Sequence, residues 1–146
     1  MIWWNKSEMS HFFLVLNDYF CYDIRMREND FKTFELEINK SRFIAYKLDL
    51  TSLDIVKPFL EILRKEHKKA KHVCYAYVYN KEIVSEKCSD DGEPGGTAGY
   101  PILNVIKKKN LTNVLVAVVR YFGGIKLGAG GLTRAYTKAC AGVLDD

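Results

Sequence analysis

Three carboxylates lie within four residues of one another in a glycine-rich stretch of the chain. We call this stretch the acidic loop, and it consists of Asp90, Asp91, Gly92, Glu93, Pro94, Gly95, Gly96 and Thr97. Carboxylates at this spacing can bind Mg²⁺, act as general acid or base, or accept hydrogen bonds from backbone amides and basic side chains. Metal sites usually draw further oxygen ligands from other segments, and the sequence identifies none. Three interpretations stay open: a structural loop that pairs with Arg120 or Lys126, a surface for a partner, and a catalytic or metal site.

A second glycine-rich stretch, residues 123–131, precedes a predicted helix and contains Lys126. Backbone N–H groups freed by glycine at a helix N-terminus can form an anion-binding nest, which the helix dipole strengthens. The stretch fits neither the Walker A loop nor the dinucleotide-binding glycine pattern. The alternative is a tight strand-to-helix connection in which the glycines permit close packing. The candidate residues for binding an anion or nucleic acid are Arg120, Gly123, Gly124, Lys126, Gly128, Gly130, Gly131 and Arg134.

Other combinations of reactive residues give weaker signals. His72, Cys74 and Cys88 lack the spacing of a zinc site, and a cysteine–histidine pair among them has no third residue to orient it. Three tyrosines share one face of a predicted strand, namely Tyr75, Tyr77 and Tyr79. They either stack on nucleic-acid bases or pack at the edge of the core. We predict no catalytic residue, no metal site and no cofactor.

Positive charge is concentrated in parts of the chain. The 146 residues carry a net charge of +4, and residues 64–71 hold five basic residues against one acidic residue. Residues 100–146 hold seven basic residues, and their two acidic residues stand at the very end. This distribution favours an anionic partner, although an ordinary solvated surface explains the same pattern.

Length and composition indicate one intracellular domain. A chain of 146 residues with 48% hydrophobic and 27% charged residues is typical of a single globular domain. No apolar run approaches the roughly 18 residues that a membrane helix needs, and no signal peptide is recognisable. The four cysteines include no closely spaced pair, which favours a reducing compartment. We expect a cytoplasmic protein with no membrane partner, while its oligomeric state does not follow from these features.

The hydrophobic pattern after residue 30 predicts eight elements in the order β-β-α-β-β-α-β-α. Alternation at Phe34, Leu36 and Ile38 marks the first strand, and a turn at 39–41 leads into the second strand at 43–48. The other elements are expected at 55–63, 72–79, 82–88, 100–109, 114–119 and 132–144. This order predicts an α+β fold, a two-layer sandwich whose mixed sheet has its helices on one face.

Residues 1–30 show neither a helical period nor strict alternation, and we expect an N-terminal extension of uncertain order there. Residues 31–146 form the expected domain. The sequence stops at Asp146 without a helix C-cap, as though a longer protein were cut at that point.

Four motifs resemble the Impact/YigZ family, within a match that runs from about Phe34 to Asp146. They are Ser41–Ala45, Ala70–Tyr77, Asp90–Gly99 and Val119–Tyr136. By this resemblance, residues 31–146 are identified as an Impact-type N-terminal domain without the small ferredoxin-like domain that usually follows it in bacterial members. The resemblance implies a fold like the second domain of a small-subunit ribosomal protein and domain IV of the translocating elongation factor. It brings no established catalytic role.

The resemblance also implies a link to translation. Eukaryotic members regulate the starvation-responsive translation-initiation kinase by competing for its activator, and residues 1–30 are too short for the partner-binding domain that those members carry. We expect a translation-associated regulatory domain that binds RNA or the ribosome through the basic glycine-loop surface. The alternatives are a protein-interaction module in the translation-control kinase pathway, and a nucleotide-dependent or hydrolytic enzyme that uses Asp91 or Glu93.

Overall fold

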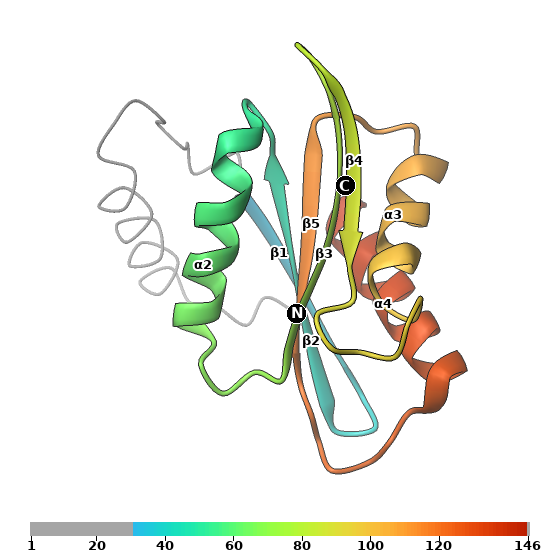
Figure 1. The fold of residues 1–146 in the computed structure, drawn as a ribbon. Helices are drawn as coiled ribbons and strands as arrows, with labels where there is room; N and C mark the ends of the chain where they lie inside the picture. Colours follow the sequence, from blue (N-terminus) through green and yellow to red (C-terminus); the bar gives the residue numbers. More distant parts are fainter. Residues whose placement is uncertain (1–30, 146) are drawn as a thin grey trace.

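The computed structural model describes residues 31–145, and the predicted N-terminal extension at residues 1–30 lies outside this range. The strands are β1 (Phe31–Ile38), β2 (Ser41–Asp49), β3 (His72–Asn80), β4 (Val84–Ser89) and β5 (Val114–Tyr121). The helices are the short 3₁₀ turn η2 (Leu53–Ile55), α2 (Val56–Glu66), α3 (Gly99–Lys108) and α4 (Gly128–Leu144). The predicted order of strands and helices is confirmed, with η2 as an addition before α2 (Figure 1).

The five strands form one antiparallel sheet in the order β1-β2-β5-β3-β4. The α+β class is therefore confirmed, but the prediction of a mixed sheet is wrong. The crossover through α2 makes β2 and β3 run in the same direction, yet β5 lies between them and is antiparallel to both. Because β5 separates them, β2 and β3 do not pair in parallel.

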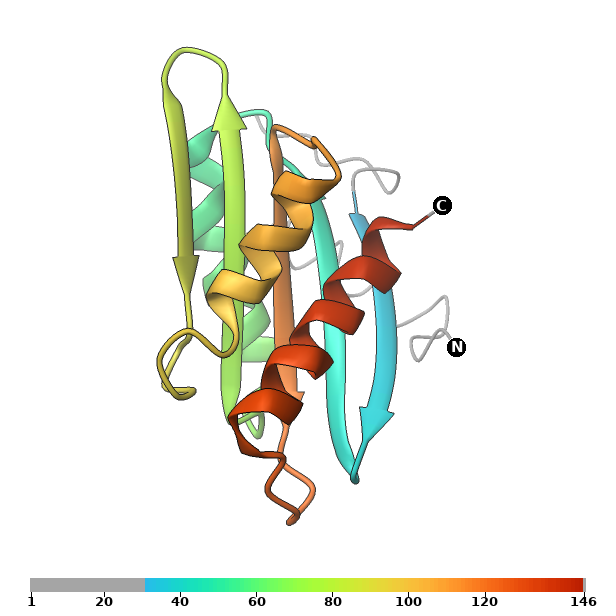
Figure 2. The ribbon, with the colours of Figure 1, turned by 90° about the vertical axis from the view of Figure 1, so that its right-hand side faces the viewer.

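Helices cover both faces of the sheet, so the prediction of a two-layer sandwich with helices on one face is wrong. Side chains of α2, among them Phe59 and Leu63, pack against one face. α3 and α4 cover the other face (Figure 1), where they lie side by side (Figure 2). Their side chains, among them Ile102 and Tyr136, pack in the core on that face. The physical reason is that the central strand β5 is apolar on both sides, since residues 114–119 are all hydrophobic and all buried.

Two close contacts hold α4 in place. Gly123, just after β5, lies so near the β1–β2 turn that a Cβ atom built on it would be 2.1 Å from the backbone of Lys40. In this turn Asn39 and Lys40 have φ angles of 48° and 67°, the conformation of a tight two-residue hairpin. Near the far end of α4, Gly142 lies against the ring of Phe34 on β1. The contacts keep the first turn of α4 at the end of the sheet where β5 ends.

Candidate functional site

A buried cluster of polar side chains joins the acidic loop to the sheet and to α4. Glu93 is at its centre, and both of its carboxylate oxygens lie 2.9 Å from Nη1 of Arg120 on β5. Its Oε2 also accepts a hydrogen bond of 2.6 Å from the hydroxyl of Tyr136 on α4. Its Oε1 lies 3.1 Å from Nε2 of His72 on β3. Each of the four residues is less than a tenth exposed, so bulk water does not replace these partners.

Both ring nitrogens of His72 face hydrogen-bond acceptors. Nδ1 lies 2.6 Å from the backbone oxygen of Asp91, and Nε2 faces the Glu93 carboxylate. A neutral imidazole has one N–H and can donate to only one of them. His72 thus links β3 to the acidic loop at both Asp91 and Glu93.

Asp90 holds the acidic loop in its shape. Its Oδ2 accepts from the N–H of Gly96 at 2.9 Å, and its Oδ1 accepts from the N–H groups of Ala98 and Gly99 at 3.1 and 2.8 Å. These last two donors stand at the start of α3, where the helix dipole favours an anion. Burial acts to raise the pKa of Asp90, but the three N–H donors outweigh it and hold the pKa below its ordinary value.

Asp91 connects the acidic loop to β3 and α2. Its Oδ2 accepts a hydrogen bond of 2.7 Å from the N–H of Val73, and its Oδ1 lies 3.7 Å from Nη2 of Arg64. All three carboxylates of the acidic loop thus have partners inside the domain, which supports the structural interpretation of this loop. Among the described residues, no group of three or more histidine, cysteine, aspartate or glutamate side chains is arranged to hold a metal ion.

A cavity of about 380 Å³ lies between the acidic loop and the start of α4. His72, Glu93 and Arg120 of the buried cluster line it, together with the exposed residues Lys71 and Lys126. The rest of its lining consists of Gly92, Pro94, Phe122, Leu127, Gly128, Ala129 and Leu132. The cavity is within the size range of sites for small organic ligands, and three cationic side chains surround it.

The first turn of α4 adds the positive end of a helix dipole to the cavity. Gly128 and Ala129, the first residues of this helix, belong to the lining. The N–H groups of a first turn have no acceptor within their own helix. The N-cap residue of α4, Leu127, makes no side-chain cap, and the first turn holds no acidic residue. An anion in the cavity is therefore favoured by the backbone as well as by the basic side chains.

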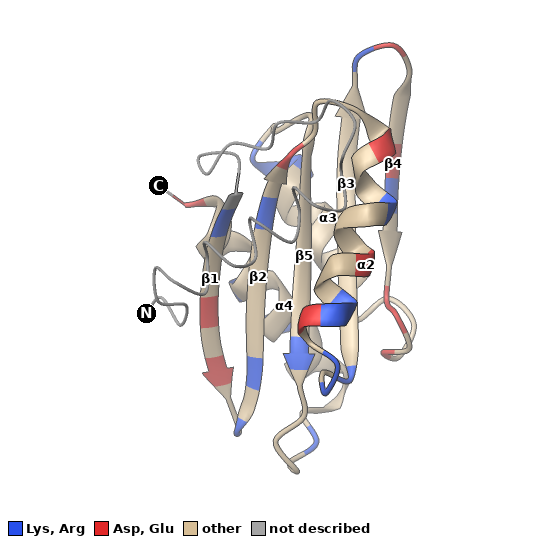
Figure 3. Ribbon diagram, turned by 90° about the vertical axis from the view of Figure 1, so that its left-hand side faces the viewer, with Lys and Arg blue, Asp and Glu red and all other residues tan. Residues whose placement is uncertain are grey.

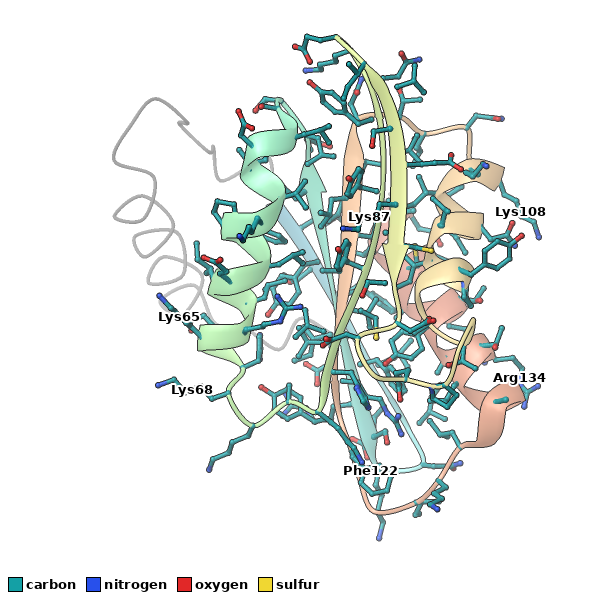
Figure 4. All side chains as sticks on the ribbon, viewed as in Figure 1. Lys65, Lys68, Lys87, Lys108, Phe122 and Arg134 are labelled. Carbon is teal, nitrogen blue, oxygen red and sulfur yellow. The ribbon has the colours of Figure 1, made fainter. Side chains whose placement is uncertain are left out.

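The structure brings together only part of the predicted anion-binding set. Arg120, Lys126 and Gly128 line the cavity. Arg134 is exposed and does not line it, because its guanidinium lies over Gly130 and points away from the body of the domain (Figure 4). The remaining predicted members lie in the loop before α4 and in its first turn, and they are Gly123, Gly124, Gly130 and Gly131.

Three residues at the site are absent from the sequence predictions for anion binding: Lys71, His72 and Tyr136. From the sequence, His72 is considered only as a zinc ligand and as a member of a cysteine–histidine pair. All three residues lie inside the motifs at 70–77 and 119–136, which extend beyond the glycines and carboxylates themselves. Considering every polar residue of these motifs, rather than only the glycines and carboxylates, could have identified Lys71, His72 and Tyr136.

The burial of Cys74 and of the three tyrosines on β3 argues against a nucleophilic cysteine and against base stacking. Cys74 is fully buried, and this burial raises the pKa of its thiol to about 12, whereas Cys88 is exposed. A thiol with such a high pKa stays protonated at neutral pH and is a poor nucleophile. The three tyrosines on β3 are at most 9% exposed and pack in the core beneath α2, so the base-stacking hypothesis for Tyr75, Tyr77 and Tyr79 is wrong.

Known proteins resemble the chain over most of its length. The Impact N-terminal domain family matches residues 39–144. IMPACT family member YvyE of Bacillus subtilis (strain 168) is 48% identical over 105 residues, which are 72% of this chain and 48% of YvyE. A crystal structure described as that of a hypothetical protein has a TM-score of 0.73 at 40% identity, over 78% of this chain and 56% of the other. The structure of the two-domain translational regulator Yih1 has a TM-score of 0.56 at 19% identity, over 97% of this chain and 69% of Yih1.

The chain spans about half the length of the curated bacterial relatives that it matches. Within residues 31–145, no helix is both long and apolar enough to cross a membrane. The matched range contains both glycine loops, the buried cluster around Glu93 and every residue that lines the cavity. Since the match to the Impact N-terminal domain covers well over half of the sequence, the chain belongs to the IMPACT family.

Proposed function

We propose that this domain is a translation-associated regulator that binds RNA, free or within the ribosome, through RNA phosphates. The observation that carries the proposal is the convergence of Lys71, Arg120 and Lys126 on one cavity at the start of α4. A role in translation is supported by Yih1, which shares the fold and is described as a translational regulator.

A basic surface continues from the cavity along the connection between α2 and β3. Lys65 is exposed in the last turn of α2, Lys68 and Lys69 are exposed in the connection, and the connection leads directly to Lys71. In Figure 3 several lysine and arginine positions are coloured along the ribbon at this end of the molecule, and the side chains of Lys65 and Lys68 extend outward in Figure 4. Exposed basic residues in such numbers bind nucleic-acid phosphates with little dependence on sequence.

Gly95, which follows the cavity-lining residue Pro94, also favours contact with a partner. A Cβ atom at Gly95 would meet nothing within 4 Å, and the φ angle of this residue is not positive. Neither packing nor backbone conformation within the domain therefore requires glycine there. The absence of a side chain lets a ligand approach the main chain closely, as binding to a phosphate backbone demands.

The test is binding of the domain to a labelled single-stranded RNA and to ribosomes over a range of salt concentrations. We expect the affinity to fall steeply as salt rises, because each phosphate contact releases counterions. Lys71→Ala and Lys126→Ala should each weaken binding and reduce the slope of log affinity against log salt by about 0.7. The control is Lys108→Ala, which removes the same charge from the exposed end of α3 and should change neither quantity (Figure 4).

Arg134→Ala shows how far the binding surface extends. A loss of affinity in this variant would extend the surface along the outer side of α4, and an unchanged affinity would confine it to the cavity and the α2–β3 connection. The proposal is wrong if the unmodified domain binds neither RNA nor ribosomes at low salt. Ribosome binding that does not respond to salt would instead favour the protein-interaction module, since an apolar interface releases few counterions.

A further inference from the structure

Arg120 at the base of the cavity has more donor groups than the described residues use. The residue is 5% exposed, and its Nη1 is paired with Glu93. Its Nη2 has only a long contact of 3.5 Å with Oγ of Ser41, and its buried Nε has no acceptor within residues 31–145. A buried guanidinium with unused donors is unfavourable by itself. Nε is closed to solvent, so negative oxygens in the cavity would stabilise the charge of Arg120 electrostatically rather than by a bond to Nε.

The charge around the cavity fits a dianion better than a single negative charge. Lys71, Arg120 and Lys126 line it, while its one carboxylate, Glu93, is already neutralised by Arg120. The start of α4 adds further positive potential. A phosphate monoester carries a charge of about −1.5 to −2 at neutral pH and presents three terminal oxygens. An internal RNA phosphate is a diester with one charge and two free oxygens, so it would neutralise less of the positive charge around the cavity.

The cavity also has an aromatic wall. Phe122 is 42% exposed and belongs to the lining. Nζ of Lys71 lies 4.9 Å from the centre of the Phe122 ring, and Cζ of Arg120 lies 5.5 Å from it. An exposed ring beside cationic groups is the arrangement on which nucleic-acid bases stack next to their phosphates.

We propose that the cavity binds the phosphate monoester of a nucleotide, with the phosphate among Lys71, Lys126 and the first turn of α4 and the base against Phe122. Two sources carry this chemistry: a free mononucleotide, and the phosphorylated 5′ end of an RNA chain. The RNA source rests on the proposed function, whereas the free mononucleotide does not.

The first experiment titrates the domain with AMP, adenosine and inorganic phosphate in a calorimeter. We expect AMP to bind and adenosine to bind at least about tenfold more weakly, because adenosine lacks the charged hydrogen-bond acceptors. Lys71→Ala and Lys126→Ala should each lower the affinity for AMP by about fivefold to tenfold. Lys108→Ala is the matched control and should leave this affinity unchanged. All three lysines are exposed, and the melting temperature of each unliganded variant shows whether the fold is retained.

Phe122→Ala separates recognition of the base from recognition of the phosphate. This variant should lower the affinity for AMP by about fivefold or more, because it removes the stacking surface. It should leave the affinity for inorganic phosphate unchanged. An equal loss for both ligands would overturn the placement of the base, and an AMP affinity that Lys108→Ala lowers as much as Lys126→Ala would overturn the placement of the site.

The second experiment compares two RNAs of one sequence that carry either a phosphate or a hydroxyl at the 5′ end. We expect the phosphorylated RNA to bind at least about tenfold more tightly and AMP to displace it. If AMP does not bind and both RNAs bind equally, the inference is overturned while RNA binding itself stands. If AMP binds and neither RNA does, the free mononucleotide is the ligand and the proposed RNA binding fails.

Discussion

His67 is a buried histidine that contacts two tyrosine hydroxyls. Its Nε2 lies 2.6 Å from the hydroxyl of Tyr46, and its Nδ1 lies 2.5 Å from that of Tyr121. Burial, aided by the charge of Arg42, lowers the pKa of His67 from 6.5 to about 4. Below about pH 6.5 the unfolded chain therefore binds a proton that the folded chain does not. We expect the free energy of unfolding to decrease from there down to about pH 4, by up to about 1.4 kcal/mol per pH unit.

Urea unfolding at neutral pH and in mildly acidic buffer measures this dependence. His67→Gln is the comparison, because glutamine retains hydrogen-bonding groups but does not titrate. The parent should lose more stability than this variant between the two conditions, even if the variant is less stable at neutral pH. Contributions from the other histidines are common to both proteins and cancel. Equal losses in the two proteins would show that His67 does not carry the effect.

The partners of individual site residues differ in how far the sequence could predict them. Asp90 accepts hydrogen bonds from N–H groups six to nine residues further along the chain, so its capping role is local and follows from a carboxylate before glycines. Glu93 contacts Arg120 and Tyr136, which are 27 and 43 residues away. Those contacts depend on the register of β5 and the position of α4, and no local pattern specifies either. Pairing of Glu93 with Arg120 was therefore one open interpretation among several.

Gly142 lets α4 pack closely on β1. A Cβ atom at this position would lie 2.3 Å from the ring of Phe34, far inside any normal contact distance. Alanine is preferred to glycine inside a helix by about 1 kcal/mol, but here the helix or the ring would have to move. We expect Gly142→Ala to lower the free energy of unfolding by about 1–3 kcal/mol, as overpacked cores do. Urea unfolding measures the difference.

Gly130→Ala is the matched control in the same helix. The nearest side-chain atoms to a Cβ there belong to the guanidinium of Arg134, at 3.3 Å, and this flexible group can move aside. The control should be neutral or more stable by up to about 1 kcal/mol. Combining Gly142→Ala with Phe34→Leu should recover part of the lost stability, because the two residues are in contact. A Gly142→Ala protein as stable as the parent would mean that α4 does not approach β1 this closely.

Stability is unevenly distributed over the whole molecule. β5 lies in the middle of the sheet and is buried through residues 114–120, whereas β4 is an edge strand whose side chains are mostly exposed. Local opening needs little free energy where few side chains are buried. We expect amide hydrogens of β5 to exchange slowest among the strands and those of β4 to exchange faster. Hydrogen exchange followed by mass spectrometry tests this, and equal protection of the two strands would contradict it.

The order of elements could be predicted because each strand and helix has its own hydrophobic period. The sequence also holds information about the arrangement of layers. The apolar run at 114–119 already indicates a strand buried on both faces, which is incompatible with helices on a single face. The antiparallel sheet was harder to predict, because it depends on β5 entering between β2 and β3 rather than joining an edge. The position of β5 within the sheet is set by the tertiary fold, and no hydrophobic periodicity in the sequence specifies it.

β5 is synthesised after both hairpins, although it lies between them in the finished sheet. Until residues 114–121 have left the ribosome, β2 and β3 each present the edge that β5 will occupy. Unpaired strand edges are templates on which other chains add strands, and incompletely folded domains aggregate through such surfaces during synthesis. Between the synthesis of β2 and that of β5, the nascent domain therefore exposes strand edges to which other chains can add. The two hairpins become parts of one sheet only when β5 pairs with both β2 and β3.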